Sequence, residues 1–237
     1  MLGRRKLRVS GEPREPREPE GRVTNPPAAI VAGSRRNHYR VRCAAPTGEN
    51  QVDALTALLH RRSEATLGEP APDGEVLANI QRAALTAADH ATLRPWRFLV
   101  IRGTARERLG ELFVRGREAV EGELSARERE RTQGRPLRAP LVIVAIGAPR
   151  QDAKVPEIEQ LLSAGAAVQN LLNAAYAQGV GAIWRTGGFA YDPVVKAGLG
   201  LGAGEHIRGF LYRGTVIAPR PPRPPLDPGD FFREWTS

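Results

Sequence analysis

The amino-acid sequence predicts one α+β domain, in which long helices flank a single sheet to give three layers. From residue 52 onward, segments with apolar residues at helical spacing alternate with short continuous apolar runs, which are typical of buried strands. The predicted order is helix, helix, strand, helix, strand, helix, strand, short helix and strand. No domain-length repeat is present in the sequence.

The first half of this domain is predicted to contain three helices and one strand. An apolar stripe predicts a first helix that ends in Arg61-Arg62-Ser63. Asp73 is a candidate N-cap of the second helix, because its carboxylate can accept hydrogen bonds from free amides of the first turn. Residues 98–101 predict a strand, and a charged amphipathic helix is expected over 104–132. The stripe of the first helix consists of Val52, Leu55, Leu58 and Leu59.

The second half adds a long helix, a short helix and three strands. Residues 141–146 form an apolar run that predicts a buried strand, and 181–185 and 207–216 are predicted to follow it in the sheet. A helix is expected over 156–178, with Gly179 as its C-cap. The centre of that helix, residues 163–168, is small on nearly every face. We therefore expect it to be buried against another element or against a partner subunit.

The composition excludes several classes of protein. No apolar run approaches the ~18–20 residues of a membrane span. The single cysteine excludes an internal disulfide and a cysteine-based zinc site, and the four histidines show no metal-ligand spacing. The sequence contains no G-x-x-x-x-G-K-[ST], H-E-x-x-H or G-x-S-x-G motif. Gly198-x-Gly200-x-x-Ala203 follows a predicted helix rather than a strand, so we interpret it as a glycine-rich turn.

The net charge of +9 is concentrated near the N-terminus, where residues 1–50 contain 11 Lys/Arg and 5 Asp/Glu. Because repeated Glu-Pro-Arg triplets provide no apolar face, we expect 1–50 to be a disordered tail or an over-extended gene start. Residues 51–237 then form the folded domain. With the charge in the tail, we do not expect a nucleic-acid footprint on the domain. The tail has no apolar signal-peptide core, so we expect a cytoplasmic protein.

Three clusters carry residues suited to ligand binding. In Arg61-Arg62-Ser63, two guanidinium groups and a hydroxyl can hold a phosphate, although basic residues at a helix end also offset the helix dipole. Asp89 and His90 lead through Arg94-Pro95-Trp96 into a strand. Trp184-Arg185-Thr186 ends another strand before two glycines, at a position where α/β proteins bind ligands. Core packing is the alternative interpretation of Trp184.

In this order and spacing, the three clusters resemble the nitroreductase family, and within it the small bacterial NAD(P)H nitroreductases. The resemblance covers roughly residues 52–235. It implies an α+β fold of three layers, with a central, mainly antiparallel sheet flanked by helices. It also implies a homodimer that binds FMN between its subunits.

The resemblance further implies roles for individual residues. Arg61, Arg62 and Ser63 match contacts to the phosphate and ribityl chain of FMN. The other implied FMN contacts are His90, Trp184, Arg185 and Thr186. The implied nicotinamide-nucleotide contacts are Ala174, Ala175, Tyr176, Ala177, Gln178 and Gly179. Thr86 stands where relatives often carry a flavin-facing arginine, so that contact is either lost or supplied by Arg94.

The function implied is an FMN-dependent NAD(P)H oxidoreductase that reduces nitroaromatics, quinones or related acceptors by ping-pong hydride transfer. The residues agree, because a chain without an evident catalytic pair needs a cofactor to supply the chemistry. No catalytic side chain is therefore assigned. Two alternatives are a flavin-binding storage or sensing protein without turnover, and a nucleic-acid-associated protein that acts through its tail. The motifs specify neither the electron acceptor nor a preference between NADH and NADPH.

Overall fold

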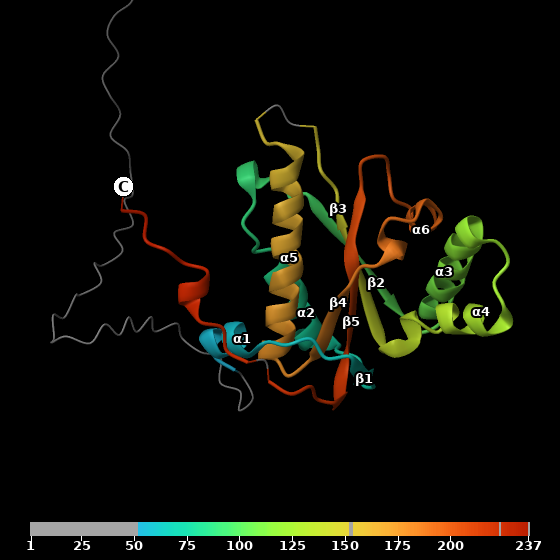
Figure 1. Cartoon of the computed structure of the whole chain (residues 1–237), viewed down its shortest axis with the longest axis horizontal. Coiled ribbons are helices and arrows are strands. Elements are labelled where there is room, and N and C mark those ends of the chain that lie inside the picture. The colour runs from blue at the N-terminus through green and yellow to red at the C-terminus, as the bar shows by residue number, and fades with distance from the viewer. Residues whose placement is uncertain (1–51, 152–153, 223, 237) are drawn as a thin grey trace, which may run out of the picture. The chain divides into compact units, whose positions relative to one another are not determined.

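The computed structural model describes residues 52–151, 154–222 and 224–236, so the expected tail, 1–50, lies outside the described residues. The helices are α1 Ala54–His60, α2 Gly74–Ala84, α3 Ala105–Glu121, α4 Ala126–Gln133, α5 Glu157–Ala177 and α6 Pro193–Gly198. The strands are β1 Thr66–Gly68, β2 Trp96–Arg102, β3 Leu141–Gly147, β4 Gly181–Arg185 and β5 His206–Ala218. Figure 1 shows this arrangement of helices around one sheet.

The sheet is built around β5, the longest strand. β5 pairs with β3, β4 and β1, and β3 also pairs with β2, so the path β1-β5-β3-β2 has β4 as an additional neighbour of β5. Each of these pairs is antiparallel. In the centre, Ile143 of β3 lies opposite both Val100 of β2 and Leu211 of β5. The predicted antiparallel character of the sheet is confirmed.

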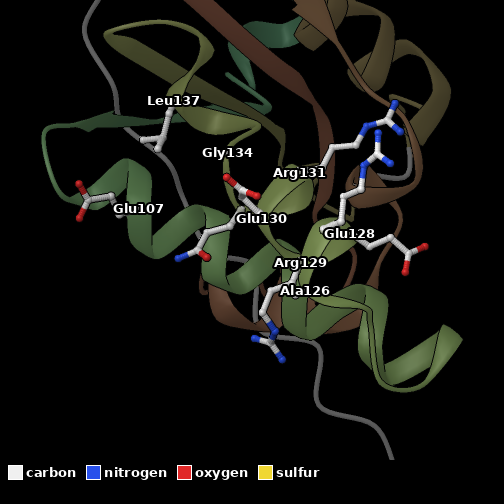
Figure 2. A pocket seen from close by; sticks show the side chains of 10 residues that line it. Glu107, Ala126, Glu128, Arg129, Glu130, Arg131, Gly134 and Leu137 are labelled. Atoms are coloured by element: carbon white, nitrogen blue, oxygen red, sulfur yellow. The ribbon is translucent and has the colours of Figure 1, made fainter.

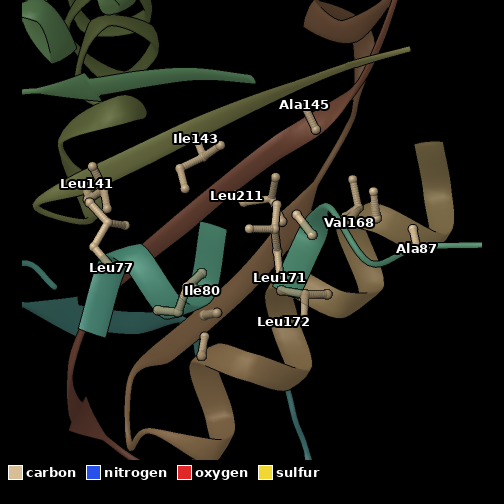
Figure 3. Packing of buried hydrophobic residues seen from close by; sticks show 14 residues of the cluster. Leu77, Ile80, Ala87, Leu141, Ile143, Ala145, Val168, Leu171, Leu172 and Leu211 are labelled. Atoms are coloured by element: carbon tan, nitrogen blue, oxygen red, sulfur yellow. The ribbon is translucent and has the colours of Figure 1, made fainter. Parts of the chain in front are cut away.

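Helices cover both faces of the sheet. β3 is buried along its whole length, as expected for a strand that is covered on both sides. α2 and α5 pack on one face, and α3 and α6 pack on the other (Figure 1). The three-layer α+β prediction is therefore confirmed. The core under α2 and α5, shown in Figure 3, includes Leu77, Ile80, Ala87, Leu141, Ile143, Ala145, Val168, Leu171, Leu172 and Leu211.

Two local predictions are wrong. The helix expected over 104–132 is interrupted, because Gly122 adopts a φ of 83° that ends α3, and Ser125 then starts α4 with a reciprocal capping box to Glu128. The first helix ends at His60, so Arg61 is its C-cap and Ser63 lies beyond the helix, in the segment before β1.

The apolar stripe of α1 is not buried within the chain. Ala57 is the buried residue of this helix, whereas Leu55, Leu58 and Leu59 are 68%, 58% and 77% exposed. The C-terminal segment also presents large apolar side chains to the surface: Leu226, Phe231, Phe232 and Trp235. Both regions therefore keep large apolar side chains at the surface of the described part of the chain.

Candidate functional site

The first predicted cluster lines a pocket of about 370 Å³. Arg61 and Arg62 come from the segment between α1 and β1, which we call the arginine segment (Arg61, Arg62 and Ser63). They face Tyr176 and Gly179 at the end of α5. The pocket therefore brings together members of two groups predicted from the sequence. Its other lining residues are Val52, Glu64, Leu172, Val180, Gly181, Ala182, Val216 and Pro219.

A buried carboxylate organises this pocket. Glu64 is 5% exposed, and its Oε1 accepts a 2.7 Å hydrogen bond from Nε of Arg62. Its Oε2 accepts a 2.9 Å bond from the backbone N–H of Arg220. The backbone N–H of Glu64 donates to the carbonyl oxygen of Ala182, at 2.9 Å, and so fastens the arginine segment to β4. The two terminal nitrogens of Arg62 have no hydrogen-bond partner among the described residues.

Half of the predicted nicotinamide stretch makes contacts within the fold. Ala175 is fully buried in the core under α5, and Ala174 packs against the same cluster. The amide of Gln178 donates to the carbonyl oxygens of Val76 and Ala174, at 3.3 and 3.0 Å. From this stretch, Tyr176 and Gly179 reach the pocket.

The Trp184 segment (Trp184, Arg185 and Thr186) presents its first two side chains to opposite faces of the sheet. Strand alternation places Trp184 on the α5 face with Ala182, whereas the guanidinium of Arg185 lies 5.9 Å from the ring centre of Tyr212 on the α3 face. Burial raises the pKa of Tyr212, so this phenol stays neutral beside the cation.

Trp184 is held at the surface rather than in the core. Its side chain is 36% exposed, and Nε1 donates a 2.8 Å hydrogen bond to the carbonyl oxygen of Arg208. A Cβ on Gly209 would come within 2.1 Å of that nitrogen. Glycine at 209 is therefore required for the indole to lie across β5, and core packing does not explain Trp184.

The loop before β2, residues 88–95, holds His90 and is called the His90 loop. Nδ1 of His90 lies 2.8 Å from Oε2 of Glu159 in the first turn of α5. Ala91, Thr92 and Arg94 all have φ between 50° and 57°, a conformation that is uncommon for residues other than glycine. The backbone N–H of Arg94 donates to the carboxylate of Asp89, at 2.7 Å, which supports this unusual loop.

Among the described residues, neither Arg94 nor Thr86 has a side-chain hydrogen bond to the arginine segment or the Trp184 segment. Arg94 is exposed. The hydroxyl of Thr86 donates to the carbonyl oxygen of Ala83, at 2.9 Å, within its own turn.

The His90 loop and the arginine segment lie at opposite ends of α5. His90 contacts Glu159 near the beginning of the helix, and Arg62 shares a pocket with Tyr176 near its end. At about 1.5 Å per residue, these two helix positions are roughly 25 Å apart. The Trp184 segment lies beside β5, where Nε1 of Trp184 donates to the carbonyl oxygen of Arg208. Within one chain, the arginine segment and the His90 loop therefore do not converge on a single point.

A larger groove, of about 920 Å³, lies along α4. Its charged side chains alternate in sign and point in different directions, as Figure 2 shows. Arg129 pairs with Glu118, and Glu128 is engaged by Ser125, so this groove offers no converging set of donors. Among the described residues, no group of His, Cys, Asp and Glu could hold a metal ion, and no helix is long and apolar enough to cross a membrane.

The sequence patterns did not identify several residues that organise the site. Glu64 lies two residues after Arg62, but its role depends on Arg220, which lies 156 positions away along the chain. Glu159 and Gly209 similarly act on side chains from distant segments. The one local signal was an acidic residue two positions after Arg62, close enough along the chain for an ion pair.

Comparisons with known proteins place these features in a family. The pattern of the nitroreductase family matches residues 58–215. The Escherichia coli protein named "Putative NAD(P)H nitroreductase YdjA" is 44% identical over 164 residues, which cover 69% of this chain and 88% of that protein. A Haemophilus influenzae protein named "Putative NAD(P)H nitroreductase" is 34% identical over 165 residues, covering 69% and 89%.

Solved structures show the same fold. A nitroreductase-like protein from Bacillus cereus superposes with a TM-score of 0.67 at 23% identity, covering 81% of this chain and all of that one. A nitroreductase with bound FMN from Bacteroides fragilis gives a TM-score of 0.60 at 21% identity, covering 80% of this chain and all of that one. From the matched residues, the identity to the relatives and this shared architecture, the chain belongs to the nitroreductase family.

Proposed function

We propose that this protein is an FMN-dependent NAD(P)H oxidoreductase that reduces nitroaromatics, quinones or related small acceptors. Family membership and the names of the relatives support an oxidoreductase that uses NAD(P)H, and an FMN-bound neighbour supports the cofactor. The observation that carries the proposal is the arginine segment, where Arg62 lines a pocket with its terminal nitrogens unpartnered among the described residues.

The residues present fit the phosphate end of FMN. Guanidinium groups form charge-assisted, bidentate hydrogen bonds with phosphate, and Arg61, Arg62 and Ser63 supply two such groups and a hydroxyl in consecutive positions. Glycine at 209 leaves the space in which the partly exposed indole of Trp184 lies. We assign the arginine segment to the phosphate and ribityl chain, and His90 and the Trp184 segment to the ring system.

When bound, FMN would supply the hydride chemistry. The chain would bind and orient the cofactor and adjust its charge. Arg185 places a cation at the end of β4, where it would stabilise the negative charge of the reduced ring. Tyr176 and Gly179 line the same pocket as Arg62 and are the members of the predicted nicotinamide stretch that a ligand can reach. If NAD(P)H and the acceptor occupy one site in turn, ping-pong kinetics follow.

We also propose that the protein is a cytoplasmic homodimer, in which the arginine segment of one subunit and the His90 loop of the other serve one FMN. The distance between these clusters along α5 supports a shared site. The exposed Leu55, Leu58 and Leu59 of α1 supply an apolar surface for the second copy. Light scattering on FMN-loaded protein would give twice the chain mass, whereas a loaded monomer would contradict the shared site.

Anaerobic mixing with NADH and with NADPH tests the proposed activity. The FMN-loaded protein is expected to lose its flavin absorbance band with at least one nucleotide, faster than free FMN does under the same conditions. A yellow protein that neither nucleotide bleaches faster than free FMN would instead favour storage or sensing. A purified protein that binds no flavin would contradict both.

A further inference from the structure

We propose that Glu64 is a positioning residue of the phosphate site, and that the C-terminal segment holds it in place through the N–H of Arg220. Glu64 fixes the side chain of Arg62 through Nε, which leaves the terminal nitrogens for the phosphate. This inference rests on the proposed function, because it assigns a role toward the phosphate of FMN.

The geometry of the Arg62–Glu64 pair leaves the phosphate-binding edge of the guanidinium accessible. The 2.7 Å bond joins Nε of Arg62 to Oε1 of Glu64. The two terminal nitrogens form the other edge of the planar group, and that edge matches two oxygens of a phosphate. Arg62 also lines both the 370 Å³ pocket and an adjoining pocket of about 170 Å³. The side chain of Arg62 therefore lies beside space that an anion could occupy.

Glu64 itself has little freedom to move. A buried carboxylate needs hydrogen-bond partners, and both oxygens of Glu64 have one, Arg62 on Oε1 and Arg220 on Oε2. Its backbone N–H is bonded to the carbonyl oxygen of Ala182. Because three segments fix this residue, the side chain of Arg62 loses less conformational freedom when the phosphate binds.

The bond from Arg220 is distinctive because of the residues around it. Residues 219–222 read Pro-Arg-Pro-Pro, and proline has no N–H. The N–H of Arg220 is therefore the single backbone donor of residues 219–222, and it donates to the carboxylate of Glu64. Pro219 lines the larger pocket and Pro222 the smaller one, so the same stretch also forms part of their walls. Residues 219–222 of the C-terminal segment thus contact the proposed phosphate site.

A carboxylate near a phosphate could instead weaken binding by repulsion. The two roles predict opposite signs: loss of a positioning residue weakens FMN binding, whereas loss of a repelling charge strengthens it. Since Glu64 has a cationic partner and two occupied oxygens, we expect the positioning role to dominate.

Glu64→Gln separates these roles. Its single carbonyl oxygen cannot serve both Arg62 and Arg220, so we expect the Kd for FMN to rise about tenfold. The Kd for riboflavin, which lacks the phosphate, should change less than about twofold by the same reasoning. Glu75→Gln is the matched control, because Glu75 forms an exposed pair with Arg82, also at 2.7 Å, away from the pocket. This control should leave both Kd values unchanged.

Two further variants test the connections of Glu64 without relying on one fold-sensitive change. Arg220→Pro removes the N–H and should raise the Kd for FMN about threefold, whereas Arg220→Ala keeps the N–H and should not. In an Arg62→Gln background, Glu64→Gln should cause no further loss of FMN affinity. A full additional loss would show that Glu64 does not act through Arg62.

Tighter FMN binding by Glu64→Gln, no change, or an equal loss for riboflavin would each overturn the positioning role. Equal effects of Arg220→Pro and Arg220→Ala would overturn the connection to the C-terminal segment. These results differ from failure of the proposed function, in which the unaltered protein would bind neither FMN nor riboflavin.

Discussion

Two arginine–carboxylate pairs in this protein have similar bond lengths but different geometry. Arg97 of β2 binds Glu205 through two nitrogens, at 2.6 and 2.7 Å, and also donates to the carbonyl oxygen of Gly200. The backbone N–H of Gly202 completes the contacts of this carboxylate. Arg62, by contrast, uses Nε alone toward Glu64 and also lines a pocket.

The comparison indicates how to distinguish a structural pair from a binding pair. In the Arg97–Glu205 pair, which we call the closed pair, two nitrogens of the arginine bind both oxygens of the carboxylate. The pair joins β2 to the turn before β5, so its contribution is to stability. In the Arg62–Glu64 pair, which we call the open pair, Glu64 binds Nε of Arg62 and leaves the two terminal nitrogens unbound by the described residues. Its contribution is therefore expected in ligand binding. Arg213 of β5 is a third case, fully buried without a carboxylate partner among the described residues.

The largest expected effect is the loss of FMN affinity on removing the open pair. Arg62→Gln removes a charge-assisted contact, so the binding free energy should fall by about 1.5–3 kcal/mol, roughly a ten- to hundredfold rise in Kd. Fluorescence titration with FMN measures this change. Arg97→Gln, the same substitution in the closed pair, should leave the Kd within about twofold. An equal loss of FMN affinity in Arg62→Gln and Arg97→Gln would contradict the distinction between the two pairs.

Arg213 should show the next largest effect, on stability. Burial lowers the pKa of Arg213 to about 9, which still leaves the side chain charged at neutral pH. Its Nη1 donates to the carbonyl oxygen of Leu171, but Nε and Nη2 have no partner among the described residues. Arg213→Leu should therefore raise the free energy of unfolding by about 2 kcal/mol. If Arg213→Leu instead unfolds at a lower urea concentration than the unaltered protein, the charge of Arg213 is compensated in the folded state.

The closed pair should give a smaller effect that depends on pH. The two bonds from Arg97 lower the pKa of Glu205 from 4.5 to about 2. Because the folded-state pKa is the lower one, the stabilisation is complete above about pH 5 and is lost as the pH falls toward 2. After allowance for solvent screening, it should amount to about 1–2 kcal/mol. Urea unfolding measures the free energy of unfolding at pH 7 and at pH 3. The difference between the two values should be smaller for Glu205→Gln than for the unaltered protein.

Local patterns in the sequence predicted much of the fold. The apolar run at 141–146 and the segment 181–185 correspond to β3 and β4, because buried strands need continuous apolar residues bounded by turn residues. β1 was not predicted, since it has three residues and pairs with a strand about 150 positions away. The pattern also failed over 104–132, where a glycine and a serine cap outweigh helical periodicity.

For the candidate site, the sequence predicted the types of residue but not their grouping. Arg61, Arg62 and Trp184 were identified from local motifs. Their supports, Glu64 with Arg220 and Gly209 beneath Trp184, depend on contacts between distant segments, which a local pattern does not encode. The exposed stripe of α1 shows the same limit, because periodicity indicates an apolar face without indicating which surface covers it.

A crystal structure of the FMN-loaded protein tests the central claim most directly. We expect a phosphate oxygen within about 3.2 Å of a terminal nitrogen of Arg62, with Nε of that residue still bonded to Oε1 of Glu64. A phosphate bound away from the arginine segment would contradict the assignment of the site. A phosphate bound to Arg62 after its release from Glu64 would contradict the positioning role.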